Sequence, residues 1–195
     1  MMGRGGSNQA FREPDNIELL YVQGAFLLDA QDCLIYTSLS ERGILSIQYQ
    51  QMTQKALARI RRFKRGDINK IFEIEEQAFP KSAYSRGTFI AYANSLPDSF
   101  IVVETGTDIV GYMIFDVSGH IHSTAVRPPY RRKGFGKMLF THALKCIKKR
   151  PWLEVRSKNS GAIKFYKGLG MKIMKRIPNY YGSDDALVMV LGQKQ

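Results

Sequence analysis

The chain has 195 residues, of which 44% are hydrophobic and 11% aromatic, so it can bury the core of one soluble globular domain with a short appendage. Its formal net charge of +12 favours an anionic partner, and a phosphorylated cofactor, ribosomal RNA and an acidic peptide all fit. The longest apolar run near the carboxyl end, Ala186 to Leu191, is far shorter than the roughly 20 residues of a membrane-spanning helix, so we predict no membrane span.

Residues 1–51 carry no recognisable chemistry, and we predict that they form an N-terminal extension of uncertain role ahead of one domain over residues 52–195. Their strand candidates are short apolar runs: Leu19–Val22, Ala25–Leu28 and Leu34–Tyr36. The amino terminus lacks the charged, apolar and small-residue succession of a secretory signal, and the two cysteines, Cys33 and Cys146, are far apart in sequence. We therefore expect a cytoplasmic protein.

A strand and a helix are predicted from Ala58 onward. An extended run reaches Phe63, and Gly66-Asp67 then offers a turn and a helix N-cap. Apolar residues recur at helical spacing until Pro80 stops the helix, while the glutamates are expected largely on the solvent side. These glutamates are Glu73, Glu75 and Glu76.

The next elements are a short helix over Arg86–Leu96 and a hairpin of the strands Phe100–Val103 and Ile109–Phe115. A further strand runs from Gly119 through Val126, because Pro128-Pro129 forbids its continuation as a paired strand.

An amphipathic helix is predicted from Gly134 to about Lys149, and Cys146 is expected to be a small core residue within it. A strand follows, and then a helix capped by Asn159 and ended by two glycines. The predicted strands of this last part are Trp152–Arg156, Met171–Ile177 and Ala186–Leu191. The succession of elements is mixed α/β.

The run Arg131-Arg-Lys-Gly-Phe-Gly136 lies after a strand and at the opening of a helix. Two glycines let the backbone approach a ligand, and a helix start exposes unpaired amides where the macrodipole favours negative charge. We therefore predict a diphosphate cradle. It lacks the third glycine of a Rossmann fingerprint and the Gly-Lys-Ser/Thr ending of a Walker loop.

Three motifs in order resemble one family. The acyl-CoA-binding motif of the GNAT superfamily of N-acetyltransferases resembles Ser123-Thr-Ala-Val-Arg-Pro-Pro-Tyr-Arg-Arg-Lys-Gly-Phe-Gly136. The segment that follows in the ribosomal-protein alanine acetyltransferase (RimI) group is similar to Trp152-Leu-Glu-Val-Arg-Ser-Lys-Asn-Ser-Gly-Ala-Ile-Lys-Phe-Tyr-Lys-Gly-Leu-Gly170. Their Tyr-Tyr…Asp-Ala…Met ending resembles Asn179-Tyr-Tyr-Gly-Ser-Asp-Asp-Ala-Leu-Val-Met189. The resemblance covers about residues 58–191 and implies a GNAT fold, a central twisted mixed sheet flanked by helices.

The resemblance implies acetyl-CoA as cosubstrate, lying between two splayed strands. Thr124, Ala125 and Val126 match the strand positions that bond to its pantetheine, and Asn159 matches a side chain that helps to hold it. The diphosphate-binding loop of the family matches Arg131, Arg132, Lys133, Gly134, Phe135, Gly136 and Lys137.

Acetyl transfer to an amine needs a base, because an amino terminus with a pKa of about 8 is largely protonated at neutral pH. Glu154 matches the catalytic glutamate of the RimI group, and strand alternation places its carboxylate away from Leu153 and Val155. Tyr166 matches the family's general-acid tyrosine, which protonates the departing thiolate. His120 occupies a Gly-His pairing seen in archaeal-type protein N-terminal acetyltransferases and is the reserve base.

Tyr180 and Tyr181 match residues that wall the peptide entrance in protein N-terminal acetyltransferases, facing the turn near Phe79 and Tyr84. Those enzymes commonly carry a glutamate after the first helix, and the run from Phe79 to Tyr84 holds no carboxylate. His120 and His122 share one strand face, but two ligands are too few for a metal site and no third has recognisable spacing, so we predict none.

The predicted activity is acetylation of the free α-amino group of a protein N-terminus, with ribosome association as one use of the positive charge. Two alternatives stay open. A small-amine acetyltransferase would keep the chemistry, although the Tyr180-Tyr181 ending argues against it. A non-catalytic basic ribosome- or RNA-binding module would explain the charge and the unassigned residues 1–51.

Overall fold

The computed structural model describes residues 11–12, 18–22, 25–28 and 57–192. The chain divides into two units, Met1–Thr53 and Gln54–Gln195, and each is described by itself. In the first unit, antiparallel strands pair in the order β1-β2-β3. They are β1 (Phe11–Arg12), β2 (Glu18–Val22) and β3 (Ala25–Leu28). The last two occur where strands were predicted, whereas the third candidate, Leu34–Tyr36, lies outside the described residues.

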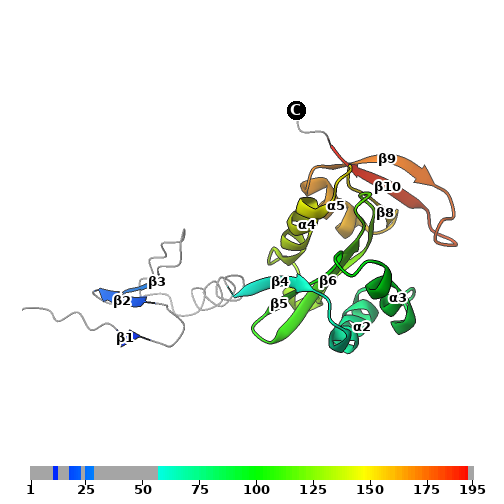
Figure 1. Ribbon diagram of the computed structural model, residues 1–195. Coiled ribbons are helices and arrows are strands. Elements are labelled where there is room, and N and C mark those ends of the chain that lie inside the picture. Colours follow the sequence, from blue (N-terminus) through cyan, green and yellow to red (C-terminus); the bar gives the residue numbers. More distant parts are fainter. Residues whose placement is uncertain (1–10, 13–17, 23–24, 29–56, 193–195) are drawn as a thin grey trace, which may run out of the picture. The chain divides into compact units, whose positions relative to one another are not determined.

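Two antiparallel sheets form the centre of the second unit (Figure 1). The first has the order β4-β5-β6-β7 and contains β4 (Ala58–Arg62), β5 (Phe100–Thr105), β6 (Asp108–Phe115) and β7 (Ile121–Val126). The second has the order β8-β10-β9 and contains β8 (Trp152–Arg156), β9 (Met171–Ile177) and β10 (Ala186–Leu191). A parallel bridge between His120 and Trp152 joins them. The predicted mixed α/β fold is confirmed, with the central sheet split in two.

Helices cover these sheets at the predicted places. They are α2 (Ile68–Ala78), α3 (Arg86–Ser95), α4 (Phe135–Cys146) and α5 (Ser160–Gly168), with short 3-10 turns η1 (Arg65–Asp67) and η2 (Pro128–Tyr130). Helix α4 ends before the predicted Lys149, because Ile147 is extended (φ −72°, ψ 127°) and the Lys148 amide donates to the Val117 carbonyl instead. Within the described residues, no helix is long and apolar enough to cross a membrane.

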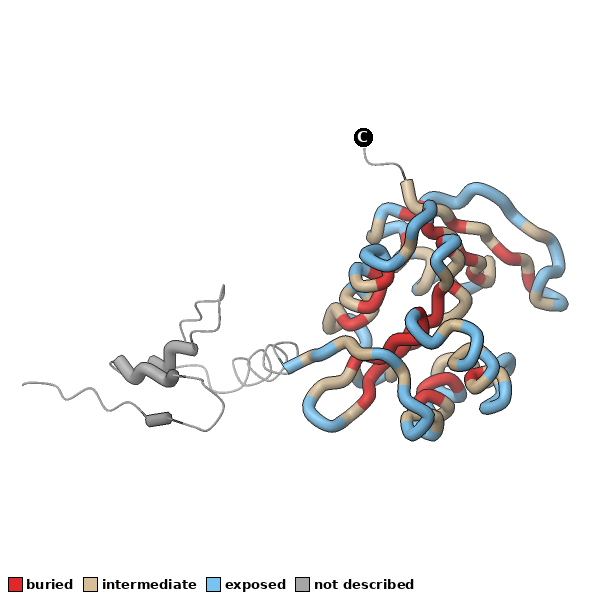
Figure 2. The backbone as a smooth tube through the Cα atoms, in the orientation of Figure 1, coloured by how far each residue is buried: buried red, intermediate tan, exposed pale blue. Residues whose placement is uncertain are grey.

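The central strands β5 and β6 consist mostly of buried residues (Figure 2). Along β5, Ile101 and Val103 belong to the apolar cluster that includes α4, while Phe100 and Val102 belong to the cluster of α2 and α3. Successive side chains of a strand point to opposite faces, so the almost continuous apolar run of β5 requires a helix layer on each side.

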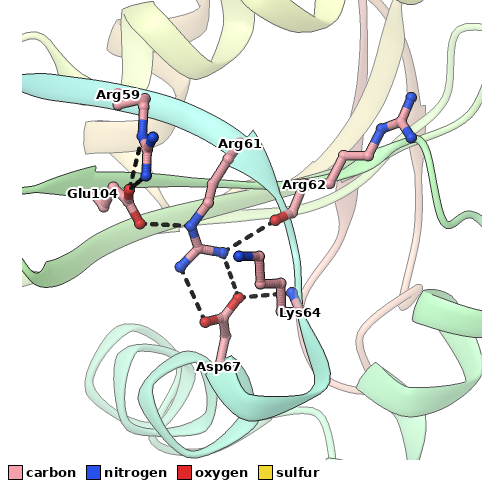
Figure 3. A network of polar contacts seen from close by, with 6 residues as sticks. All are labelled: Arg59, Arg61, Arg62, Lys64, Asp67 and Glu104. Atoms are coloured by element: carbon pink, nitrogen blue, oxygen red, sulfur yellow. Dashed lines mark hydrogen bonds and ion pairs between the residues drawn. The ribbon is translucent and has the colours of Figure 1, made fainter.

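An ion-pair network fixes the start of α2 against the edge of the first sheet (Figure 3). The Arg61 guanidinium on β4 lies 2.7 Å from Asp67 Oδ2 and 2.6 Å from Glu104 Oε2 on β5. The hydrogen bond to Asp67 contributes most to a raised pKa of Arg61, and the bond to Glu104 adds to it. Asp67 occupies the N-cap position of α2 as predicted, but its carboxylate accepts from the Lys64 amide and from Arg61 rather than from an α2 amide.

Two burial predictions are wrong. Glu75 is only 2% exposed, unlike Glu73 and Glu76, because it lies four residues after the buried Ile71 and therefore on the same face of α2. Cys146 is exposed, because the end of α4 packs on the apolar cluster through Ala143 and Ile147 instead.

Candidate active site

Strands β7 and β8 run side by side and meet at only one end. The Trp152 amide donates to the Gly119 carbonyl at 2.8 Å beside the His120–Trp152 bridge, and β8 then pairs with β10 on its other side. The predicted splay between two strands is therefore present, and it opens from this bridge toward the carboxyl end of β7.

The register of β7 decides which backbone groups face the opening. The Arg127 amide donates to the Val110 carbonyl, and Ala125 lies opposite Tyr112, so Arg127 and Ala125 are the hydrogen-bonded positions toward β6. Thr124 and Val126 alternate with them, which directs their amides and carbonyls toward the gap. Of the predicted trio, these two can bond to a ligand, while Ala125 is buried in the core.

The start of α4 lies where the diphosphate cradle was predicted. Gly134 occupies the N-cap position with a left-handed backbone (φ 91°) and makes no side-chain cap. Its carbonyl accepts the first helical hydrogen bond, from the Met138 amide. The amides of residues 135–137 therefore have no partner within the helix. The Phe135 side chain is buried and can contribute only its amide. Gly136 packs closely on α5, because a Cβ there would lie 3.0 Å from the Phe165 ring.

Basic side chains surround this helix start, and Arg131, Arg132 and Lys137 are exposed. Arg131 Nε donates to the Val126 carbonyl at 2.9 Å, and Lys133 Nζ lies 5.3 Å from the Tyr130 ring centre. Free amides and guanidinium groups are the donors that bind phosphates, so this set fits the diphosphate of coenzyme A. Asn159 is exposed and accepts from the Ala162 amide at 3.0 Å, which makes it the N-cap of α5.

Glu154 and His120 form one hydrogen-bonded pair at the bridge between the sheets. Glu154 Oε2 lies 2.8 Å from His120 Nε2, and the two side chains are 15% and 22% exposed. The His120 ring stacks on Trp152 with 3.9 Å between centres and 5° between planes, which fixes its orientation. The predicted base and the predicted reserve base are therefore direct partners.

A second pair, His122 and Asp116, lies beside the first. His122 Nε2 is 3.1 Å from Asp116 Oδ2, and the rings of His122 and His120 are 4.2 Å apart. Burial, and then the charge of His120, lower the pKa of His122. Burial works against ionisation of Asp116, but hydrogen bonds led by that from Ser118 lower its pKa.

The sequence reasoning missed Asp116. It follows β6 directly, and its carbonyl accepts from the Gly119 amide, whose residue has a φ of 105° that lets the chain reverse before His120. The sequence did contain an indication of this contact, because Asp116 precedes His120 by four residues and Gly119 between them favours a turn. The fold therefore brings a third potential ligand, Asp116, beside His120 and His122, although its spacing in the sequence did not mark it as a ligand.

Tyrosines from the loop between β9 and β10 and from helix α3 lie around the Glu154–His120 and His122–Asp116 pairs. The Tyr180 hydroxyl reaches Glu154 Oε1 at 3.5 Å and packs edge-on against Tyr181, whose ring lies 4.2 Å from the Arg156 guanidinium. The charge of Glu154 is the main cause that raises the pKa of Tyr180, and burial raises that of Tyr181 to about 12. From α3, Tyr92 adds a ring 5.3 Å from His122, a contact that the sequence did not indicate.

The loop after α2 supplies the opposing side. Tyr84 contacts Tyr92, and burial raises its pKa, with further contributions from Tyr92, Glu75 and Tyr181. Phe79 packs on the core cluster of α2 instead. Buried Glu75 accepts from the Tyr84 amide at 3.0 Å and from the Tyr112 hydroxyl, so a carboxylate does hold this loop, although none lies in it.

Tyr166 is buried on α5, packed against Phe140 and Phe165. Burial, with a contribution from the neighbouring Tyr181, raises the pKa of its phenol, which therefore keeps its proton at neutral pH.

Comparisons with known proteins agree on one family. The sequence model of the acetyltransferase (GNAT) family matches residues 68–171, more than half of the chain. An N-alpha-acetyltransferase of Sulfurisphaera tokodaii is 32% identical over 152 residues, covering 67% of this chain and 90% of the relative. The [ribosomal protein bS18]-alanine N-acetyltransferase of Escherichia coli is 31% identical over 138 residues, covering 64% and 90%. Among solved structures, Ard1 from Thermoplasma volcanium superposes with a TM-score of 0.64 at 28% identity, covering 70% of this chain and 99% of that one.

Proposed function

The chain belongs to the GNAT family of acetyltransferases, and on this premise we propose that it acetylates the free α-amino group of a protein N-terminus. The relatives named for N-alpha-acetylation and for alanine acetylation of ribosomal protein bS18 support this acceptor. The observation that carries the proposal is the Glu154–His120 pair, at 2.8 Å, beside the point where β7 and β8 separate.

Glu154 acts as the base, with His120 as its partner. A carboxylate that is 15% exposed remains accessible to an amine or to a relaying water, and the stacked His120 ring holds its second oxygen in place. When the amino terminus loses a proton and becomes the nucleophilic amine, that proton can be shared within the pair, because a hydrogen-bonded imidazole and carboxylate form a unit with a common proton.

The acetyl donor is acetyl-CoA, which supplies the acetyl group as a reactive thioester when bound. Thr124 and Val126 present backbone groups to its pantetheine, and the amides from Phe135 to Lys137 bind its diphosphate with Arg131 and Arg132. Asn159 supports the same region as the cap of α5. The Val126 amide faces the gap and would donate to the reacting carbonyl oxygen as negative charge develops there.

Tyr166 donates the proton that the departing thiolate requires. Its buried phenol is protonated at neutral pH, and its neighbour Tyr181 belongs to the loop that approaches Glu154. The acid therefore belongs to α5 and the base to β8, so proton removal and proton delivery use different elements.

The acceptor site has aromatic walls, with Tyr84 and Tyr92 on one side and Tyr180 and Tyr181 on the other. Rigid aromatic side chains suit a peptide backbone better than a small polyamine, which would require carboxylates. The net charge of +12 is compatible with a substrate on the ribosome, and ribosome association remains a prediction. The free thiol of Cys146 is consistent with a cytoplasmic location.

The test is an acetyl-CoA assay against peptides that vary in their first two residues. We expect acetylation of the α-amine, and none of a peptide with a blocked amino terminus and an internal lysine. Preferential acetylation of small amines would support the first alternative. Salt-sensitive RNA binding without any acetylation would support the second and overturn the proposal.

A further inference from the structure

Three side chains beside the proposed base could hold a metal ion together. Asp116, His120 and His122 each offer one ligand atom, and these atoms all lie within 4.8 Å of one another. We propose that they form a zinc-binding site through which zinc inhibits the enzyme. The inhibitory part rests on the proposed function, whereas the binding part does not.

The hydrogen bonds indicate which nitrogen of His120 would bind zinc. Its Nε2 lies 2.8 Å from Glu154, so Nδ1 is the nitrogen that remains. Asp116 lies close to the backbone of His120, because its Oδ1 accepts from the His120 amide at 3.2 Å, and Nδ1 is the ring nitrogen nearer the backbone. Histidines that bind zinc usually donate their other ring N–H to a carboxylate, and Glu154 occupies that position.

The spacing of the other two ligands suits a tetrahedral ion. His122 Nε2 lies 3.1 Å from Asp116 Oδ2. With metal–ligand bonds of about 2.0 Å, two ligands of a tetrahedral site are about 3.3 Å apart, so zinc can replace the proton of this hydrogen bond with little movement. Two imidazoles and one carboxylate with a fourth position for water are typical of zinc rather than of magnesium.

Zinc at this position would disable the proposed base. Coordination of Nδ1 fixes the proton of His120 on Nε2, where Glu154 accepts it, and the cation lowers the basicity of the whole pair. The side chains are only about one-fifth exposed, so the charge of the ion is weakly screened. Acetyl transfer should therefore stop at zinc concentrations that saturate the site.

The binding experiment is a competition titration of ZnCl2 against a chromogenic chelator. It uses the full chain with Cys33→Ser and Cys146→Ser, so that no thiol competes for zinc. Cys146 in particular lies one turn from His142 on α4, and the two would offer a separate pair of ligands. We expect one zinc per chain. His122→Ala should weaken zinc binding more than about 100-fold, and Glu154→Gln, which alters only the outer partner, by about 10- to 100-fold.

His142→Ala is the matched control, since it removes the third histidine of the chain and should leave the affinity unchanged. Asp116→Asn provides a second ligand variant if His122→Ala does not fold. Equal zinc affinity in the ligand variants and the control would overturn the site. Full acetylation of a peptide at saturating zinc would overturn the inhibition. If no peptide is acetylated, the titration still tests the site independently of the proposed function.

Discussion

Glu154→Gln provides the most direct test of the proposed base. Glutamine preserves the shape of the side chain and one hydrogen bond to His120, but it cannot accept a proton. A positioned general base contributes about 10²- to 10⁴-fold, and a charge-assisted hydrogen bond such as that at 2.8 Å contributes about 1.5 to 3 kcal/mol. We expect kcat/KM for an N-terminal peptide to fall about 10²- to 10³-fold, with unchanged coenzyme A affinity by calorimetry.

His120→Phe tests whether the two residues act as a unit. Phenylalanine retains the ring that stacks on Trp152 at 3.9 Å but removes the nitrogen that contacts Glu154. If one proton is shared by the pair, the double variant should be little worse than the poorer single variant. The residual rate of Glu154→Gln should also rise about tenfold from pH 7 to pH 9, as the neutral fraction of an amine with a pKa of about 8 grows.

The proposal that Glu154 and His120 act together as the base is refuted if both single variants retain near-normal kcat/KM. It is also refuted if the loss in the double variant equals the product of the two single losses, because independent groups behave in that way. A change in coenzyme A affinity in either variant would indicate a structural effect instead of lost proton transfer.

Three further predictions concern other parts of the site. Tyr166→Phe should reduce kcat more than about 10²-fold with little change in peptide KM, and a wild-type kcat in steady-state assays would exclude it as the acid. Gly134→Ala should lower the free energy of unfolding by about 1 to 2 kcal/mol, because φ is 91°, and should weaken coenzyme A binding in calorimetry. Gly168→Ala is its control, because an added Cβ there would have no atom within 4 Å. Burial raises the pKa of Glu75, so its stabilising contribution is complete below its ordinary pKa of 4.5 and is lost as pH rises through the folded value. Glu75→Gln should therefore gain stability relative to the unsubstituted chain between pH 4.5 and 8 in urea titrations, and a pH-independent difference would contradict this.

Local patterns were sufficient to predict most elements of the second unit. The strand Trp152–Arg156 and the cap at Asn159 occur as predicted, because alternation and side-chain capping depend on neighbours in sequence. The end of α4 could not be predicted, because Lys148 leaves the helix to bond with Val117 on another segment. The burial of Glu75 was visible in its spacing from Ile71, but its partners Tyr112 and Tyr84 come from other elements.

The sequence by itself determined the family and the helix start at Gly134, and it led to the proposal of Glu154 as the base, since each depends on a contiguous motif. Only the tertiary structure decided that Glu154 and His120 touch, that Asp116 joins His122, and that Thr124 and Val126 rather than Ala125 face the gap. The residues of each of these contacts are brought together by the pairing and register of β6, β7 and β8, which the turn at Gly119 and packing on both faces of the sheet determine. Residues far apart along the chain become neighbours only through those long-range contacts, which no local pattern encodes.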